Sequence, residues 1–129
     1  MKRNVVQERT EEMALACIAV GRMLQDDCRE YILSKQLIRS GTNPGAMVCE
    51  SRHAASTRDF LHKLRIGKQE TEESLYWLRL IRKSNYLPAS KLAAADDLCD
   101  QVLRLLTAII KTVSAKLEQE EAAKRRQNK

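Results

Sequence analysis

Apolar residues recur at helical spacing along most of the chain. Met13, Cys17, Val20 and Leu24 follow one another at steps of four, three and four residues, which places them on one face of a helix. We predict this first helix over roughly residues 5–25.

The next apolar pattern, from about residue 28 to 55, contains the stretch SGTNPGA at residues 40–46. Gly41 can adopt the left-handed conformation that ends a helix, and Pro44 suits the first position of a new one. Asn43 precedes that proline and is therefore disfavoured in the helical region. The sequence predicts a second helix that is kinked or broken between Gly41 and Pro44.

Two longer helical patterns follow. Ser56 and Asp59 form a variant of the capping box, which predicts a third helix over about residues 57–84. Pro88 suits the start of a fourth helix, whose apolar residues recur at steps of three and four up to Leu117. Four helices with short connections predict an all-α, up-down-up-down four-helix bundle. We assign this domain to residues 1–122 and expect residues 123–129 to form a basic flexible tail.

The composition indicates the cellular compartment of the protein. No apolar stretch reaches the ~20 residues of a membrane span, and the N-terminus lacks the pattern of a signal peptide. We therefore expect a cytoplasmic protein without membrane contact, in which the four cysteines are reduced thiols. The cysteines lie far apart without the C-x-x-C spacing that indicates zinc.

Two short motifs resemble metal ligands. The pairs Glu50/His53 and Asp59/His62 have the spacing of the Glu-x-x-His elements in di-iron bundles. A di-iron centre also needs carboxylates from the remaining helices, and residues 103–117 contain no acid. We interpret both pairs as solvated polar residues and expect no metal and no cofactor. Because no nucleophile elbow or phosphate-binding loop is recognisable either, we expect no enzymatic activity and no catalytic residues.

Basic residues provide a functional hypothesis. A net charge of +6 and a pI near 9.3 favour anionic partners, nucleic acid first. The alternative is an ordinary solvated surface with no specific ligand. The predicted nucleic-acid-binding residues are Arg52, Arg58, Lys63, Arg65, Lys68, Arg79, Arg82 and Lys83.

A second apolar face on the third helix suggests self-association. A slender bundle exposes much of each helix, so apolar residues away from its core favour an external partner. Because Trp is enriched at interfaces, Trp77 is the centre of this prediction. We predict a homo-oligomer whose interface residues are Met47, Val48, Ile66, Trp77, Leu80 and Ile81.

Two long segments carry a family resemblance. The segments REYILSKQLIRSGTNPGA and STRDFLHKLRIGKQETEESLYWLRLIRKSNYL resemble the four-helix-bundle family of ribosomal-RNA intervening-sequence proteins. The family pattern runs S-K-Q-L-x-R-S-G-T-S-I-G-A-N-x-x-E, then S-x-x-D-F, then E-x-x-Y-W-L-x-L. The chain departs from it at Asn43-Pro44, which replace Ser-Ile, at Met47, which replaces Asn, and at Cys49, where Glu is common. The matching positions are Ser34 to Gly41, Thr42, Gly45, Ala46, Glu50, Ser56, Asp59, Phe60, Glu73, Tyr76, Trp77, Leu78 and Leu80.

This resemblance implies more than the residues alone do. A related branch of the family comprises the accessory variability proteins of diversity-generating retroelements, which form barrel-shaped homopentamers that bind a reverse transcriptase and nucleic acid. The first hypothesis is therefore a ring-shaped, homopentameric scaffold that binds RNA or an RNA–DNA duplex as a partner of a reverse transcriptase. The second is an intervening-sequence-type protein–protein interaction module without direct nucleic-acid binding.

Overall fold

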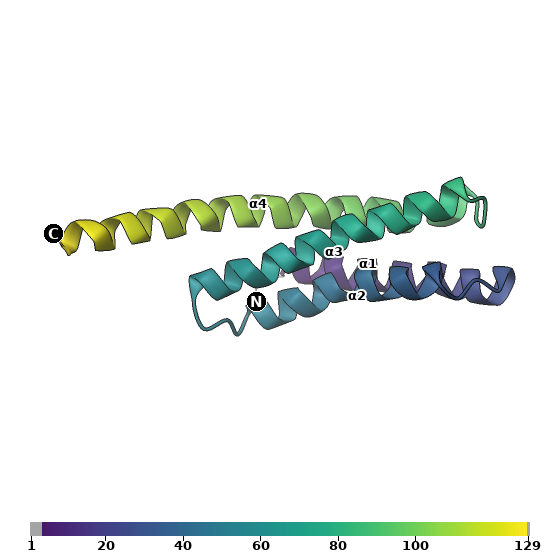
Figure 1. Ribbon diagram of the computed structural model, residues 1–129, viewed down its shortest axis with the longest axis horizontal. Helices are drawn as coiled ribbons and strands as arrows, with labels where there is room; N and C mark the ends of the chain where they lie inside the picture. Colours follow the sequence, from purple (N-terminus) through teal and green to yellow (C-terminus); the bar gives the residue numbers. More distant parts are fainter. Residues whose placement is uncertain (1–3, 129) are drawn as a thin grey trace.

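The computed structural model describes residues 4–128, which form four α-helices. These are α1 (Val5–Cys28), α2 (Leu33–Ser51), α3 (Thr57–Lys83) and α4 (Ala89–Gln127). Each helix packs against the next, and α4 also packs against α1 (Figure 1). The predicted all-α four-helix bundle is confirmed. In this arrangement α1 lies diagonally opposite α3, and their outward faces point away from each other.

The core lies along the inner faces of the four helices. Met13, Cys17, Val20 and Leu24 of α1 are all fully or almost fully buried, as their spacing predicted. The inner face of α4 is buried only in its first half, at Leu92, Ala95, Cys99, Val102 and Leu106.

The connection between α1 and α2 begins later than predicted. Arg29 takes the left-handed conformation, with φ of 52°, and its N–H returns to the carbonyl of Leu24. The buried carboxylate of Glu30 then accepts backbone N–H groups from Ile32 and Leu33, at 3.1 and 2.9 Å, and from Ser34. This carboxylate satisfies N–H groups that a helix start leaves without partners, so α2 begins at Leu33 rather than near residue 28.

Of the two predicted alternatives for α2, the break is wrong, and the kink stays a prediction. The helix runs without interruption from Leu33 to Ser51, with Pro44 in its interior. Proline there removes one helical hydrogen bond and disfavours the helix, so tertiary packing must compensate for it. Pro44 is buried and lies beside Gly67 of α3.

The glycines of α2 allow close packing rather than a turn. A Cβ added to Gly41 would lie 2.5 Å from the Cβ of Cys17, a separation that real Cβ atoms do not show. In α1, a Cβ on Gly21 would lie 2.5 Å from the side chain of Ile38. Neither position has a positive φ. Gly41 is needed because α1 and α2 approach each other so closely at Cys17, whereas the Ile38 side chain beside Gly21 is flexible and can move.

The start of α3 and the C-terminal part of α4 lie at the same end of the molecule (Figure 1). Ser56 caps α3 as predicted, because its hydroxyl accepts the Asp59 N–H at 3.0 Å. The C-terminal part of α4 projects past the start of α3 (Figure 1). The chain stays helical to Gln127, past residue 123, where the predicted tail begins. Lys129 lies outside the described residues, so the flexibility of the tail stays a prediction.

Candidate nucleic-acid interface

The outward face of α3 carries a stripe of solvent-exposed residues at steps of four and three. We call this set the α3 stripe. Its only acid is Glu72, whereas four of its members are Arg or Lys. The members, all exposed, are Arg58, His62, Arg65, Gln69, Glu72, Tyr76, Arg79 and Lys83.

The α3 stripe is long enough to follow a nucleic-acid backbone. From Arg58 to Lys83 the helix rises ~37 Å, at ~1.5 Å per residue. That length is close to one turn of a DNA duplex, ~34–36 Å. Phosphate contacts require only Lys and Arg, and their positive charges displace counterions.

The stripe's arginines are held in different ways. Arg58 pairs with Glu121 of α4, and the guanidinium of Arg65 donates to the hydroxyl of Ser114, also in α4, at 3.1 Å. The guanidinium of Arg79 lies 5.5 Å from the centre of the Tyr76 ring, within range of a cation–π contact. Arg79 and Lys83 have no ion pair within residues 4–128, so their charges are the most accessible to an anion.

The other four predicted basic residues point elsewhere. Arg52 follows α2 and donates to the Gln7 side chain of α1 at 2.7 Å, and Lys63 pairs with Glu50 of α2 at 3.2 Å. Arg82 lies 3.6 Å from Asp96 of α4. Lys68 is half-buried. The structure therefore brings together only Arg58, Arg65, Arg79 and Lys83 of the eight.

The predicted oligomer interface does not form one outward surface. Val48 and Ile81 are 2 % and 0 % exposed and belong to the protomer's own core, so their assignment to an interface is wrong. Trp77 packs against that core, and its indole Nε1 is buried without a hydrogen-bond partner. The remaining three, Met47, Ile66 and Leu80, are half-buried.

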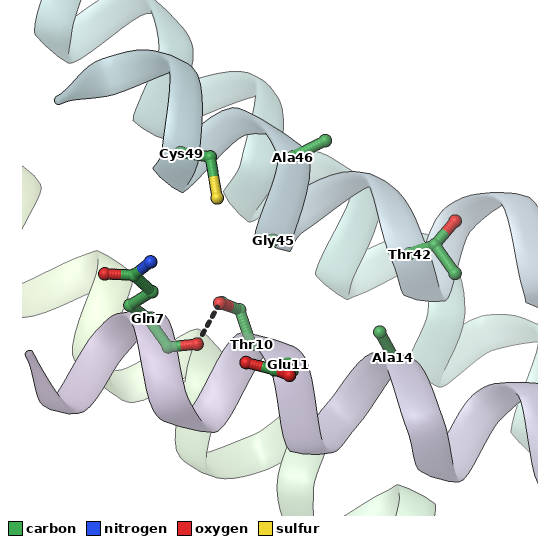
Figure 2. A pocket seen from close by; sticks show the side chains of 8 residues that line it. All are labelled: Gln7, Thr10, Glu11, Ala14, Thr42, Gly45, Ala46 and Cys49. Atoms are coloured by element: carbon green, nitrogen blue, oxygen red, sulfur yellow. Dashed lines mark hydrogen bonds between the residues drawn. The ribbon is translucent and has the colours of Figure 1, made fainter. Parts of the chain in front are cut away.

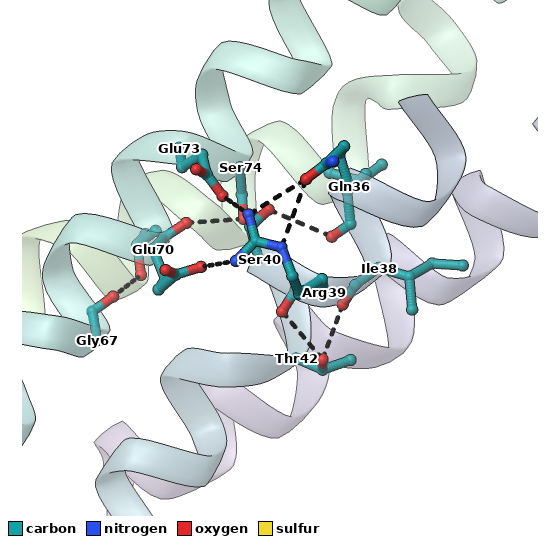
Figure 3. Close-up of polar contacts among 11 residues, drawn as sticks. Gln36, Ile38, Arg39, Ser40, Thr42, Gly67, Glu70, Glu73 and Ser74 are labelled. Carbon is teal, nitrogen blue, oxygen red and sulfur yellow. Dashed lines mark hydrogen bonds and ion pairs between the residues drawn. The ribbon is translucent and has the colours of Figure 1, made fainter. Parts of the chain in front are cut away.

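A charged cluster between α2 and α3 was not anticipated. Arg39 of α2 pairs with Glu70 at 2.9 Å and with Glu73 (Figure 3). Beneath it, the hydroxyl of Ser74 donates to that of Ser40 at 2.8 Å. Burial opposes the charge of Arg39, but its hydrogen bonds and attraction to both glutamates prevail and raise its pKa. These contacts join α2 to α3. Because Glu70 and Glu73 offset the charge of Arg39, this cluster is less basic than the α3 stripe.

A shallow groove of about 240 Å³ lies on the opposite side of the molecule, between α1 and α2. Figure 2 shows Cys49 pointing from α2 toward α1 across this groove. The residues that line it include Gln7, Glu11 and Ala14 of α1 and Gly45 and Ala46 of α2.

The thiols and histidines show no assembled metal site. Cys17 and Cys99 are buried, Cys28 is half-buried and Cys49 is exposed. Hydrogen bonding with Cys17, together with burial, raises the pKa of Cys99 and keeps it protonated. Across residues 4–128, no three His, Cys, Asp or Glu side chains are grouped so that they can hold a metal ion.

The geometry defines a small all-helical protein in which the outward face of α3 is basic. Within the described part, no helix has the length and apolarity to cross a membrane. The model of the 23S rRNA-intervening sequence protein family matches residues 2–108, and the chain belongs to this family.

A solved structure shares this fold. It is the crystal structure of a protein of unknown function from the S23 ribosomal protein family of Bacteroides thetaiotaomicron, with a TM-score of 0.80 and 32% sequence identity. The match covers 82% of this chain and 98% of that one. No curated protein matches.

Proposed function

We propose that this protein is a non-enzymatic scaffold that binds the phosphate backbone of structured RNA or of an RNA–DNA duplex through the α3 stripe. The observation that carries this proposal is the regular exposure of Arg58, Arg65, Arg79 and Lys83 along one face of a single helix. Such a row contacts several phosphates along a backbone without reading bases, so we expect weak dependence on sequence and strong dependence on salt.

The scarcity of aromatic residues on the α3 stripe favours binding of a duplex over binding of a single strand. Binding of single strands relies on aromatic side chains that stack with bases. Only one aromatic residue, Tyr76, lies on the stripe, and Arg79 already covers its ring. The scaffold therefore fits a regular double-helical backbone best.

The resemblance to accessory variability proteins extends this proposal to a reverse transcriptase as protein partner and to a ring of five copies. A ring needs a heterologous contact, in which two different surfaces meet. With Val48 and Ile81 in the core, the interface predicted for such a ring loses two of its members. Nucleic-acid binding by the α3 stripe does not depend on the number of copies.

A second candidate function is a protein–protein interaction module without nucleic-acid binding. It is favoured by the connection between α1 and α2, where Tyr31 and Ile32 are 53 % and 76 % exposed. The buried cap made by Glu30 fixes this connection, so both side chains are held in solvent. Rigid exposed apolar residues at one end of a bundle suit a protein partner.

Charge-removing variants separate the two candidates. The test variant replaces Arg79 and Lys83 of the stripe by glutamine, and the control replaces Lys35 of α2 and Lys91 of α4. All four residues are exposed and without an ion pair within residues 4–128, so both variants lose the same charge. Binding to a fluorescent RNA–DNA duplex is measured across a salt series.

We expect the stripe variant to lose at least about tenfold in affinity, with a salt slope smaller by roughly one for each lost phosphate contact. The control should change much less. Equal losses in both variants indicate general electrostatic attraction and contradict the assignment to α3. Absence of binding by the wild-type protein at low salt contradicts nucleic-acid binding and leaves the interaction module.

A further inference from the structure

Two tyrosines are exposed at the end of the bundle where the α3 stripe ends. Tyr31 lies in the connection between α1 and α2, and Tyr86 lies in the connection between α3 and α4. They are 53 % and 43 % exposed. The thiol of Cys28 donates to the backbone carbonyl of Tyr86 at 3.4 Å, so the two connections lie side by side at this end (Figure 1). We call Tyr31 and Tyr86 the tyrosine pair.

The backbone holds both tyrosines in place. Before Tyr86, Asn85 takes the left-handed conformation with φ of 62°, and the N–H of Tyr86 donates to the carbonyl of Ile81 at 3.3 Å. Before Tyr31, the buried carboxylate of Glu30 fixes the start of α2. Because the backbone beneath both rings is already ordered, little freedom is lost when a ligand binds to them.

Cations without ion pairs adjoin the tyrosine pair. Lys83, the last member of the α3 stripe, is three residues from Tyr86, which corresponds to at most ~11 Å of extended chain. Arg29 is exposed two residues before Tyr31 and, like Lys83, has no ion pair within residues 4–128. Side chains that bind phosphate and rings that stack with bases are therefore neighbours at this end of the molecule.

This arrangement suits bases that are not paired. Inside a duplex the bases stack on one another, whereas bases beyond its end expose flat faces that tyrosine rings stack with irrespective of sequence. The third tyrosine, Tyr76, is less suited because Arg79 covers its ring. Asp26 and Asp27 are exposed in the last turn of α1 and limit the positive charge here. Stacking rather than charge therefore has to supply any preference for unpaired bases.

We propose that the tyrosine pair binds the unpaired bases of a strand that continues past the end of the duplex held by the α3 stripe. The ligand is then an RNA or RNA–DNA duplex with a single-stranded overhang, whose duplex part ends near Lys83. This inference rests on the proposed function, because the α3 stripe supplies the contact with the duplex. It adds the form of the nucleic acid and the position of its junction, and it does not depend on the number of copies.

Three fluorescent ligands test the proposal with the full chain. The first is a blunt RNA–DNA duplex, and the second is the same duplex with an overhang of about four unpaired nucleotides. The third has an overhang of equal length made of abasic sugar-phosphates, which adds the same charge without bases. Fluorescence anisotropy measures the affinity for each. The test variant is Y31L/Y86L, which keeps apolar side chains but removes the rings, and the controls are Y31F/Y86F and Ile32→Ala.

The wild type should bind the overhang with bases at least about fivefold more tightly than the blunt duplex, and the abasic overhang should add much less. In Y31L/Y86L the gain from the bases should disappear, while affinity for the blunt duplex stays within about twofold. Y31F/Y86F should keep the gain because phenylalanine stacks as well, and Ile32→Ala should keep it because Ile32 has no ring. Circular dichroism should be unchanged, since Tyr31, Ile32 and Tyr86 are all exposed.

Several outcomes overturn the proposal, and they are distinct from failure of the proposed function. A wild type that binds the blunt duplex but gains nothing from an overhang refutes the tyrosine pair alone. An equal gain from the abasic overhang assigns the effect to phosphates, and an undiminished gain in Y31L/Y86L assigns it to other residues. Loss of the gain in Ile32→Ala indicates a general apolar contact rather than stacking. Absence of binding to all three ligands refutes the α3 stripe and the tyrosine pair together.

Discussion

The bundle joins its helices in two different ways, which are clearest where α1 meets α2 and where α3 meets α4. The contact between α1 and α2 depends on small residues, since Gly41 leaves no space between its backbone and Cys17. The contact between α3 and α4 has larger side chains and charged pairs at its edge, such as Arg58–Glu121 and Arg82–Asp96. The packing at Gly41 tolerates no added atom, whereas the peripheral ion pairs between α3 and α4 tolerate replacement.

The difference shows why the same residue type has unequal importance along the chain. Gly41 and Gly45 lie one turn apart on α2, yet a Cβ on Gly45 would be 3.6 Å from Thr10, an ordinary contact distance. Only one of these two glycines is required by packing. Alanine substitutions at these two glycines should therefore change the free energy of unfolding with opposite signs.

The largest effect should appear in the reactivity of the thiols. Cys17, enclosed where α1 meets α2, should react with a thiol reagent only through unfolding, at least a thousandfold more slowly than exposed Cys49. Timed labelling with peptide mass spectrometry measures both rates, and Cys49→Ser identifies the fast site. Rapid labelling of Cys17 in the folded protein would show that this seam is open.

Gly41→Ala should lower the free energy of unfolding by ~1–3 kcal/mol, because its methyl group overlaps the Cβ of Cys17. Urea denaturation followed by circular dichroism measures the change. Adding Cys17→Ala should not restore stability, since alanine keeps the Cβ that causes the overlap. Wild-type stability in Gly41→Ala would mean that the helices separate without cost.

Gly45→Ala should have the opposite sign and raise the free energy of unfolding by ~0.5–1 kcal/mol. The new methyl group has room beside Thr10, and alanine favours the helix more than glycine does. The same urea experiment compares both variants directly. A destabilised Gly45→Ala protein would show that this part of the seam is as tight as the part around Gly41.

Arg82→Gln, between α3 and α4, should change the free energy of unfolding by less than ~0.5 kcal/mol, since the pair with Asp96 is partly exposed and screened. Burial raises the pKa of Asp96, and Arg82 opposes that rise. In the variant the folded pKa rises further above the unfolded one, so the loss should grow as pH rises from about 3 to 7. Urea midpoints at both pH values test this, and a larger loss at pH 3 would contradict it.

Helix boundaries that depend on local signals were predicted correctly from the sequence. The prediction failed where packing against neighbouring helices determines the structure. Ser56 and Pro88 mark where α3 and α4 begin, and both starts were predicted to within one residue. Gly41 and Pro44 carry equally clear local signals for a break. The helix continues through them because its partners are α1 and α3, which no local pattern reveals.

Part of the candidate nucleic-acid interface could also be predicted from the sequence. The common face of Arg58, His62, Arg65 and Gln69 follows from spacing alone, and all four are exposed. Ile81 was misplaced although it lies three residues after buried Leu78, a step that indicates the same face. The contacts of Arg39 with Glu70 and Glu73 depend on how α2 and α3 align, which the sequence does not specify.

The projecting end of α4 has a consequence for how the protein moves in water. A helix of 39 residues is ~58 Å long, whereas a compact chain of this size, with a radius of gyration of ~14 Å, is only about 36 Å across. The molecule should therefore tumble faster about its long axis than end over end. On gel filtration a single chain should elute ahead of compact standards of 14.7 kDa, as though it were larger. Elution volume alone would then mistake an elongated single chain for a pair.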